Sequence, residues 1–211
     1  MKVLAFNGSP REDGNTFHAL DTVTKVLNGH GIEAEIIQVG KAPISGCLAC
    51  ARCYDNKNEK CVIDDGIVNE CIQKVKTADG ILLGSPVYYS SIAGNMKSFL
   101  DRLFYVAGSN GSLMRHKAGA AIAAVRRTGG SETFASLNYY FLISEMFVPA
   151  SNYWNVVHGC TPGEVFKDDE GMQTMKVLGT NMALLLKSLD KNKEEIANYP
   201  KEPKIDTNFI R

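Results

Sequence analysis

Four cysteines crowd into one short stretch of the chain, and thiols at this spacing can hold a metal centre. They form the pattern C-x2-C-x2-C-x7-C and are Cys47, Cys50, Cys53 and Cys61. The two-residue gaps let successive thiolates turn toward one compact centre, and such a close run favours a [4Fe–4S] cluster. Zinc also accepts four thiolates, although a structural zinc site usually shows two separated C-x2-C pairs. A disulfide between two of these thiols is a third interpretation.

A second group of chemically suited residues lies in segment 7–16, which follows the first apolar run and precedes an expected helix. Glycines let the backbone approach a ligand closely, and the free N–H groups and positive dipole end of a helix attract an anion. Short polar side chains and one arginine complete a site that suits a phosphate monoester: Ser9, Arg11, Asn15 and Thr16. The segment matches neither GxGxxG nor GxxxxGK[ST], and a plain capped turn is the alternative.

Two further loops have the same small and polar character. The loop at 84–95 has two adjacent tyrosines, Tyr88 and Tyr89, and several small residues, so it can lay backbone and hydrogen-bond donors against the edge of a flat ring. The loop at 126–133 precedes another expected helix and contains Thr128, Gly129 and Gly130. Each loop alone is consistent with an ordinary helix start. All three follow expected strands, however, so we expect them to converge on one crevice.

Short apolar runs alternate along the chain with longer segments of helical period. The runs predict strands at residues 2–6, 33–39, 80–85, 117–125 and within 148–157. The periodic segments predict helices at 16–28, after an N-cap at Asp64–Asp65, and at about 94–106, 131–147 and 170–189. This alternation predicts an α/β fold, a doubly wound five-stranded parallel sheet with helices on both faces. Ligands of such sheets bind beyond the carboxyl ends of the strands.

The three loops together resemble one known family. The motifs on which this resemblance rests are Gly8-Ser9-Pro10-Arg11 with Gly14-Asn15-Thr16, Gly84-Ser85-Pro86-Val87-Tyr88, and Lys97-Ser98-Phe99-Leu100-Asp101-Arg102. Over residues 1 to about 190 they look like the flavodoxin-like NAD(P)H-dependent FMN reductase superfamily. The resemblance implies that the FMN phosphate is bound by Ser9, Arg11, Asn15 and Thr16. It implies that the isoalloxazine contacts Pro86, Val87, Tyr88 and Tyr89 and is flanked by Thr128, Gly129 and Gly130.

The cysteine pattern resembles that of the iron–sulfur flavoproteins of anaerobic prokaryotes, a branch of the same superfamily. The resemblance implies a cluster that relays single electrons near the flavin, with Cys47, Cys50, Cys53 and Cys61 as its ligands. The last gap is at the long end of that pattern. Cluster-free relatives keep a shorter cysteine pattern ending in Cys-Val-Ile, as at residues 61–63, so a cluster-free protein stays an alternative. Cys71 and Cys160 are expected to be core or incidental thiols.

Charge and length exclude several classes of function. The 211 residues carry 23 basic and 23 acidic side chains, so no field draws the chain to nucleic acid or to an anionic membrane. The apolar run at 118–125 is far shorter than the ~18 residues that a membrane span needs. We expect a cytoplasmic protein with one FMN-binding domain at 1–195, including the cysteine-rich loop 41–63, and a C-terminal tail at 196–211.

Three functions fit these features. The first is an FMN-dependent oxidoreductase that passes electrons through a cluster, between a reduced donor and a small-molecule or ferredoxin-type protein acceptor. The second is a cluster-free NAD(P)H-dependent FMN or quinone reductase, and the third is a flavodoxin-like carrier without its own turnover. No catalytic triad is expected, because the flavin carries the chemistry. His158 is a candidate for the crevice wall. A homodimer or homotetramer is expected, with segments 139–141 and 199–211 as association surfaces.

Overall fold

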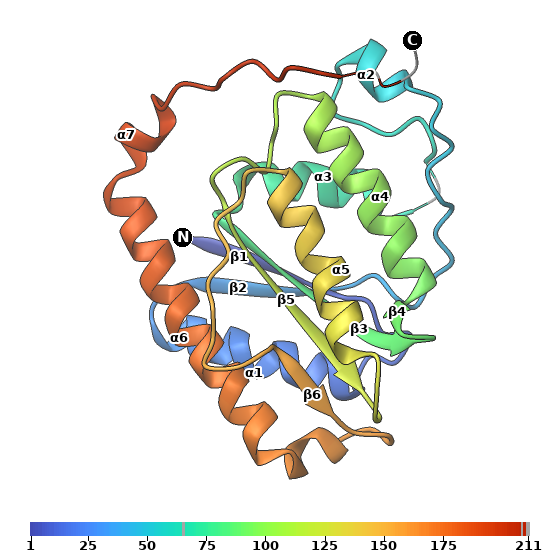
Figure 1. The fold of residues 1–211 in the computed structure, drawn as a ribbon, viewed down its shortest axis with the longest axis vertical. Helices are drawn as coiled ribbons and strands as arrows, with labels where there is room; N and C mark the ends of the chain where they lie inside the picture. The colour runs from blue at the N-terminus through green and yellow to red at the C-terminus, as the bar shows by residue number, and fades with distance from the viewer. Residues whose placement is uncertain (65, 208, 210–211) are drawn as a thin grey trace.

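A parallel sheet with helices on both faces forms the centre of the computed structural model, which describes residues 1–64, 66–207 and 209 (Figure 1). The strand order is β2-β1-β3-β5-β6, and each neighbouring pair is parallel. The strands are β1 (Lys2–Asn7), β2 (Glu33–Gln38), β3 (Gly80–Tyr88), β5 (Ala118–Val125) and β6 (Val156–His158). The predicted fold class is therefore confirmed. A short strand that was not predicted, β4 (Ser91–Ile92), pairs antiparallel with the end of β3.

The helices divide between the two faces of the sheet. Side chains buried on one face come from α1 (Asn15–Gly29) and α6 (Asp169–Lys191). Those on the other face come from α3 (Val68–Thr77), α4 (Gly94–Ser109) and α5 (Gly130–Ile143). The remaining short elements are α2 (Arg52–Asn56), the 3₁₀ helix η1 (Glu164–Lys167) and α7 (Lys193–Ala197). No helix in the described part of the chain is long and apolar enough to cross a membrane.

Successive side chains of a strand point to opposite faces of the sheet, so each strand contributes to the core on both faces. In β1, Val3 and Ala5 pack toward α1 and α6, whereas Leu4 and Phe6 pack toward the opposite helices. All eight residues of β5 are buried, as expected for a parallel strand covered on both faces. Small side chains on β5 let α5 approach closely, because a Cβ on Gly119 would lie 2.7 Å from a ring carbon of Phe141.

Several predicted element ends were wrong. The helix expected at 131–147 ends at Ile143. A strand does form within 148–157, as expected, but it begins only at Val156 and continues to His158. The intervening chain is instead held by single contacts, such as the Asn155 Nδ2 donating to the Ala121 carbonyl at 3.0 Å. Helix α3 begins at Val68 without a side-chain cap, so Asp64 does not cap it. Asp65 lies outside the described residues.

The C-terminal segment leaves α7 and crosses the molecule toward α2 (Figure 1). Arg115 holds the start of this segment by donating to the carbonyl oxygens of Tyr199 and Pro200 at 3.4 and 3.1 Å. Lys201 donates to the hydroxyl of Ser112 at 2.5 Å. The tail expected at 196–211 thus overlaps the end of α7 and contacts the body of the protein, in its described part, as far as Lys201.

Candidate functional site

The loop after β1 is fixed by its own short polar residues. The fully buried Asn7 accepts the Ser9 N–H through Oδ1 at 3.1 Å, and the Ser9 hydroxyl accepts the Arg11 N–H at 3.1 Å. Gly8 donates to the Gly84 carbonyl at 2.8 Å. A Cβ on Gly8 would lie 2.8 Å from that same oxygen, so only glycine allows the loop to lie this close to β3.

The start of α1 presents an uncompensated positive end. Its N-cap is Gly14, no side chain caps it, and its first turn contains no acidic residue. The first N–H groups of the helix and its dipole are therefore available to an anion. A Cβ on Gly14 would lie 3.1 Å from the Arg11 Cβ and 3.3 Å from the Ser9 hydroxyl, so the glycine keeps this cradle open. The geometry fits a phosphate group.

One cavity of about 210 Å³ lies at this helix start. It brings together seven residues that the sequence singled out: Ser9, Arg11, Asn15, Thr16, Pro86, Val87 and Tyr88. It also includes two residues to which sequence reasoning gave no role, Arg126 at the end of β5 and Cys160 after β6. Two arginines beside a helix start strengthen the preference for a phosphorylated ligand.

Asn15 has structural partners that sequence reasoning missed. Its Nδ2 donates to the Thr161 carbonyl at 3.0 Å, and its Oδ1 accepts the Val165 N–H at 3.2 Å. Gly159 makes this approach possible, because a Cβ there would lie 2.6 Å from the Asn15 Nδ2. The Asn15 side chain therefore ties the segment after β6 to the start of α1.

The hairpin between β3 and β4 forms a second wall of the cavity. Its turn residues Tyr89 and Ser90 both have positive φ, 50° and 56°, a conformation that costs about 1–3 kcal/mol for a non-glycine residue and that clusters at ligand sites. The Ser85 hydroxyl fixes the hairpin by accepting the Ala93 N–H at 3.0 Å. Tyr88 lines the cavity, but the fully exposed Tyr89 does not.

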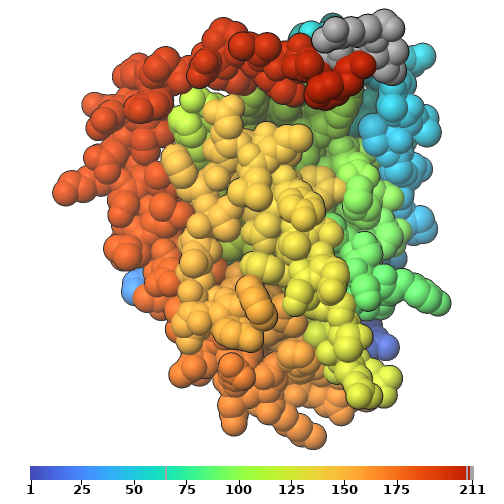
Figure 2. Space-filling view, viewed as in Figure 1, coloured from blue at the N-terminus to red at the C-terminus, as the bar shows by residue number. Residues whose placement is uncertain are grey.

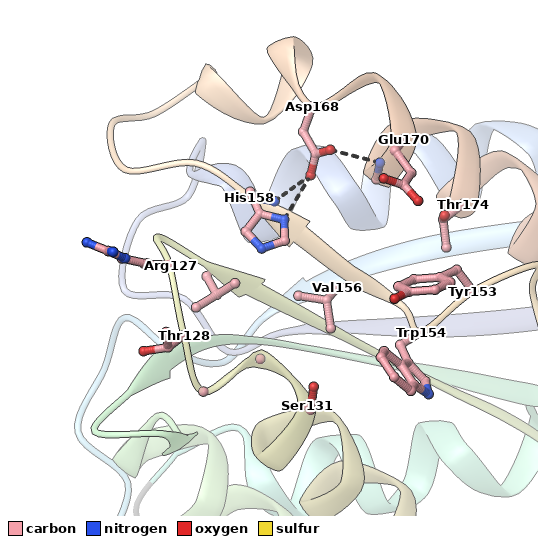
Figure 3. A pocket seen from close by; sticks show the side chains of 14 residues that line it. Arg127, Thr128, Ser131, Tyr153, Trp154, Val156, His158, Asp168, Glu170 and Thr174 are labelled. Carbon is pink, nitrogen blue, oxygen red and sulfur yellow. Dashed lines mark hydrogen bonds and ion pairs between the residues drawn. The ribbon is translucent and has the colours of Figure 1, made fainter.

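The loop between β5 and α5 contacts this hairpin and borders a neighbouring pocket of about 190 Å³ (Figure 3). Gly129, at φ 85°, approaches the hairpin so closely that a Cβ would lie 2.7 Å from the Ser90 Cα. Thr128, Gly129 and Gly130 line the neighbouring pocket rather than the cavity at α1. His158 lies in the same pocket, where its backbone N–H donates to the Asp168 carboxylate at 2.7 Å and its ring Nδ1 lies 3.3 Å from that carboxylate.

The four clustered cysteines line one small cavity of about 20 Å³ between the cysteine loop and α4. Cys53 is buried, Cys61 is partly buried, and Cys47 and Cys50 are exposed. Within the residues that the structure describes, no three His, Cys, Asp or Glu side chains are placed to hold a single metal ion. Four thiol side chains around one centre are nevertheless the donor set that a [4Fe–4S] cluster takes.

The backbone between these cysteines is unusual. Ala49 and Ala51 have φ of 50° and 57°, and Lys57 and Glu59 follow with 50° and 56°. Ala51 in the left-handed region is followed directly by the right-handed turn of α2, and such left–right pairs occur where successive N–H groups face anions and iron–sulfur clusters. Both the donor set and the backbone fit a cluster.

The two remaining thiols differ from the clustered four. Burial raises the pKa of Cys71 to about 12, so this thiol stays protonated in the core near neutral pH. Burial also raises the pKa of Cys53. The expected core thiol is therefore Cys71. Cys160 is not in the core: it is exposed and lines the cavity at α1.

Comparisons with known proteins agree with this geometry. Residues 1–160 match the model of the NADPH-dependent FMN reductase family. An iron–sulfur flavoprotein of Methanocaldococcus jannaschii is 35% identical over 199 residues, covering 90% of this chain and 100% of its own. One of Methanosarcina thermophila is 29% identical over 197 residues, covering 92% and 100%. Among solved structures, RosB with a bound riboflavin-5'-phosphate derivative has a TM-score of 0.73 at 15% identity, covering 100% and 92%, which shows the fold alone.

Proposed function

Because this chain belongs to the NADPH-dependent FMN reductase family, in its iron–sulfur flavoprotein branch, we propose that it is an electron-transferring enzyme with two centres, FMN and a [4Fe–4S] cluster. The chain is a flavin-dependent oxidoreductase. The observation that carries the finer proposal is that all four clustered cysteines line one small cavity.

The FMN phosphate sits at the start of α1 in this proposal. The N–H groups of the first turn, the Ser9 and Thr16 side chains and the Arg11 guanidinium bind it, and Arg126 adds a second positive charge. Asn15 acts indirectly, by holding the segment after β6 against the helix start.

The flat ring of FMN lies against the β3–β4 hairpin, over Pro86, Val87 and Tyr88. The rigid turn orients the ring, and Tyr89 reaches it only through a movement of its exposed side chain. Thr128, Gly129 and Gly130 flank the ring on the side where their loop touches the hairpin. Bound there, FMN supplies the capacity to accept two electrons and release them one at a time.

The cluster is held by Cys47, Cys50, Cys53 and Cys61 in this proposal, and it supplies a carrier of single electrons. Cys53 anchors the site because it is already buried, whereas Cys47 and Cys50 lie on exposed chain. Six free cysteines suit a reducing compartment, so we place the protein in the cytoplasm. Its partners are a reduced donor, NAD(P)H or a ferredoxin-type protein, and a small-molecule or protein acceptor.

Self-association completes the proposal. Helix α5 lies at the surface in the middle of the face that Figure 2 shows, and it exposes large apolar side chains there, with Tyr139 65%, Leu142 64% and Ile143 83% accessible. Contiguous apolar surface of this kind marks an interaction site, and its occupant here is a second copy of the chain in a homodimer or homotetramer. Light scattering of the Ile143→Glu variant should show a smaller particle than the wild type, and an unchanged mass would contradict this part.

Iron analysis of cysteine variants, purified without oxygen, tests the cluster. Cys47→Ser and Cys53→Ser should each lose iron and sulfide while retaining FMN, because the thiols and the proposed flavin site line two separate cavities. Cys160→Ser is the matched control, an exposed cysteine outside the pattern that should keep its iron. Equal iron in all three variants would refute the ligand assignment. A wild type without iron that oxidises NADPH steadily would instead select the cluster-free reductase.

A further inference from the structure

Arg102 is a charged residue inside the protein that the proposed function leaves without a role. It belongs to α4, it is only 1% exposed, and it lines the same cavity as the four clustered cysteines. Burying a guanidinium is costly, so such a residue is retained where its hydrogen bonds serve the structure or its charge serves a site.

The guanidinium joins the two ends of the cysteine segment. Its Nη1 donates to the carbonyl oxygen of Ser45 at 3.2 Å, and its Nη2 donates to the carbonyl oxygen of Ile63. Ser45 stands two positions before Cys47, and Ile63 stands two positions after Cys61. One side chain on a rigid helix therefore fixes both the entry and the exit of the segment that carries all four thiols.

The same geometry places positive charge in the cavity wall. Four thiolates make a cluster site anionic, and each electron that enters adds one further negative charge. A cation in a poorly hydrated wall interacts more strongly with that charge than a cation in water does. It therefore favours the reduced cluster over the oxidised one.

We propose that Arg102 is a positioning residue for the cluster, which closes the cysteine segment at both ends and raises the cluster's reduction potential. This inference rests on the proposed cluster. It assigns to one residue of α4 both the retention of iron and the ease with which the cluster accepts an electron.

Three variants separate these two effects. Arg102→Met removes both the hydrogen bonds to the Ser45 and Ile63 carbonyls and the positive charge. Arg102→Lys keeps the charge, but a single ammonium does not reproduce the planar fork that reaches two carbonyls. Lys60→Gln is the matched control, since it removes a positive charge next to Cys61 from an exposed position. Each protein is reconstituted with iron and sulfide without oxygen, and FMN content verifies folding.

Iron release to a chelator and the midpoint potential from an EPR-monitored redox titration are then measured. Both Arg102 variants should release iron at least several-fold faster than the wild type. In Arg102→Met the reduced cluster should be disfavoured at least tenfold, a shift of about 59 mV to more negative potential for a one-electron couple. Arg102→Lys should stay closer to the wild-type potential, and Lys60→Gln should match the wild type in both measurements.

Wild-type iron release and potential in Arg102→Met would overturn the inference. If Arg102→Met does not fold, Arg102→Lys decides, and wild-type iron release in that variant would overturn it as well. A wild type that binds FMN but no iron would refute the proposed cluster itself, a result distinct from any difference among the variants.

Discussion

Replacing Arg11 by alanine should weaken FMN binding without weakening the fold. The Arg11 side chain is exposed at the rim of the cavity, while its backbone N–H is held independently by the Ser9 hydroxyl at 3.1 Å. A hydrogen bond to a charged group contributes about 1.5–3 kcal/mol. Solvent screening favours the lower end, and about 1.4 kcal/mol is tenfold in Kd. We therefore expect the Kd for FMN to rise about tenfold.

Fluorescence titration of the apoprotein measures this Kd, with riboflavin as the comparison ligand because it lacks the phosphate. Arg11→Ala should leave the Kd for riboflavin unchanged, so that the preference for FMN over riboflavin falls about tenfold. Arg127→Ala is the matched control, since this exposed arginine lines the neighbouring pocket and not the cavity at α1. Equal losses for FMN and riboflavin, or equal losses in both variants, would refute the phosphate assignment.

Three further predictions concern the residues that build the site. Asn15→Ala should lower the free energy of unfolding of the apoprotein by about 1–3 kcal/mol in urea titrations, because it leaves the Val165 N–H without its acceptor; an unchanged midpoint would show that the bridge is dispensable. Gly8→Ala should cost about 1–3 kcal/mol, because its Cβ would lie 2.7 Å from the Met96 Cβ, and wild-type stability would contradict the close packing. The pKa of Cys71 is raised to about 12 in the folded protein, whereas an ordinary thiol has a pKa of about 8.5. Between these two pH values the thiol is ionised in the unfolded state and protonated in the folded state. The free energy of unfolding should then fall with rising pH toward about 12, by up to about 1.4 kcal/mol per pH unit, and Cys71→Ala, compared across pH, should lack this component.

The fold could be predicted from local patterns because buried parallel strands and amphipathic helices differ clearly in period. The apolar run at 80–85 became the core of β3, and the stripe at 170–189 became α6. Four short elements were missed for a physical reason. Helix α2, strand β4, the 3₁₀ helix η1 and helix α7 have five, two, four and five residues, too few to show a period.

The place of the candidate site could be predicted, because loops that follow parallel strands converge at one edge of the sheet. The sequence did not reveal that the Asn15 amide would bond to Thr161 and Val165, because those contacts span about 150 positions of chain. Nor did it reveal that only one of the two adjacent tyrosines would line the cavity, Tyr88, while Tyr89 is fully exposed in the β3–β4 turn. Arg102 appeared in the sequence as part of a motif, and only its burial against the cysteine cavity gave it a role.

Analysis of flavin, iron and sulfide in protein purified without oxygen examines both proposed centres at once. We expect one FMN and one [4Fe–4S] cluster per chain, with visible absorbance near 400 nm beyond that of the flavin and an EPR signal after reduction. Stoichiometric FMN without iron and sulfide would contradict the two-centre account and leave a flavin reductase with a free cysteine loop.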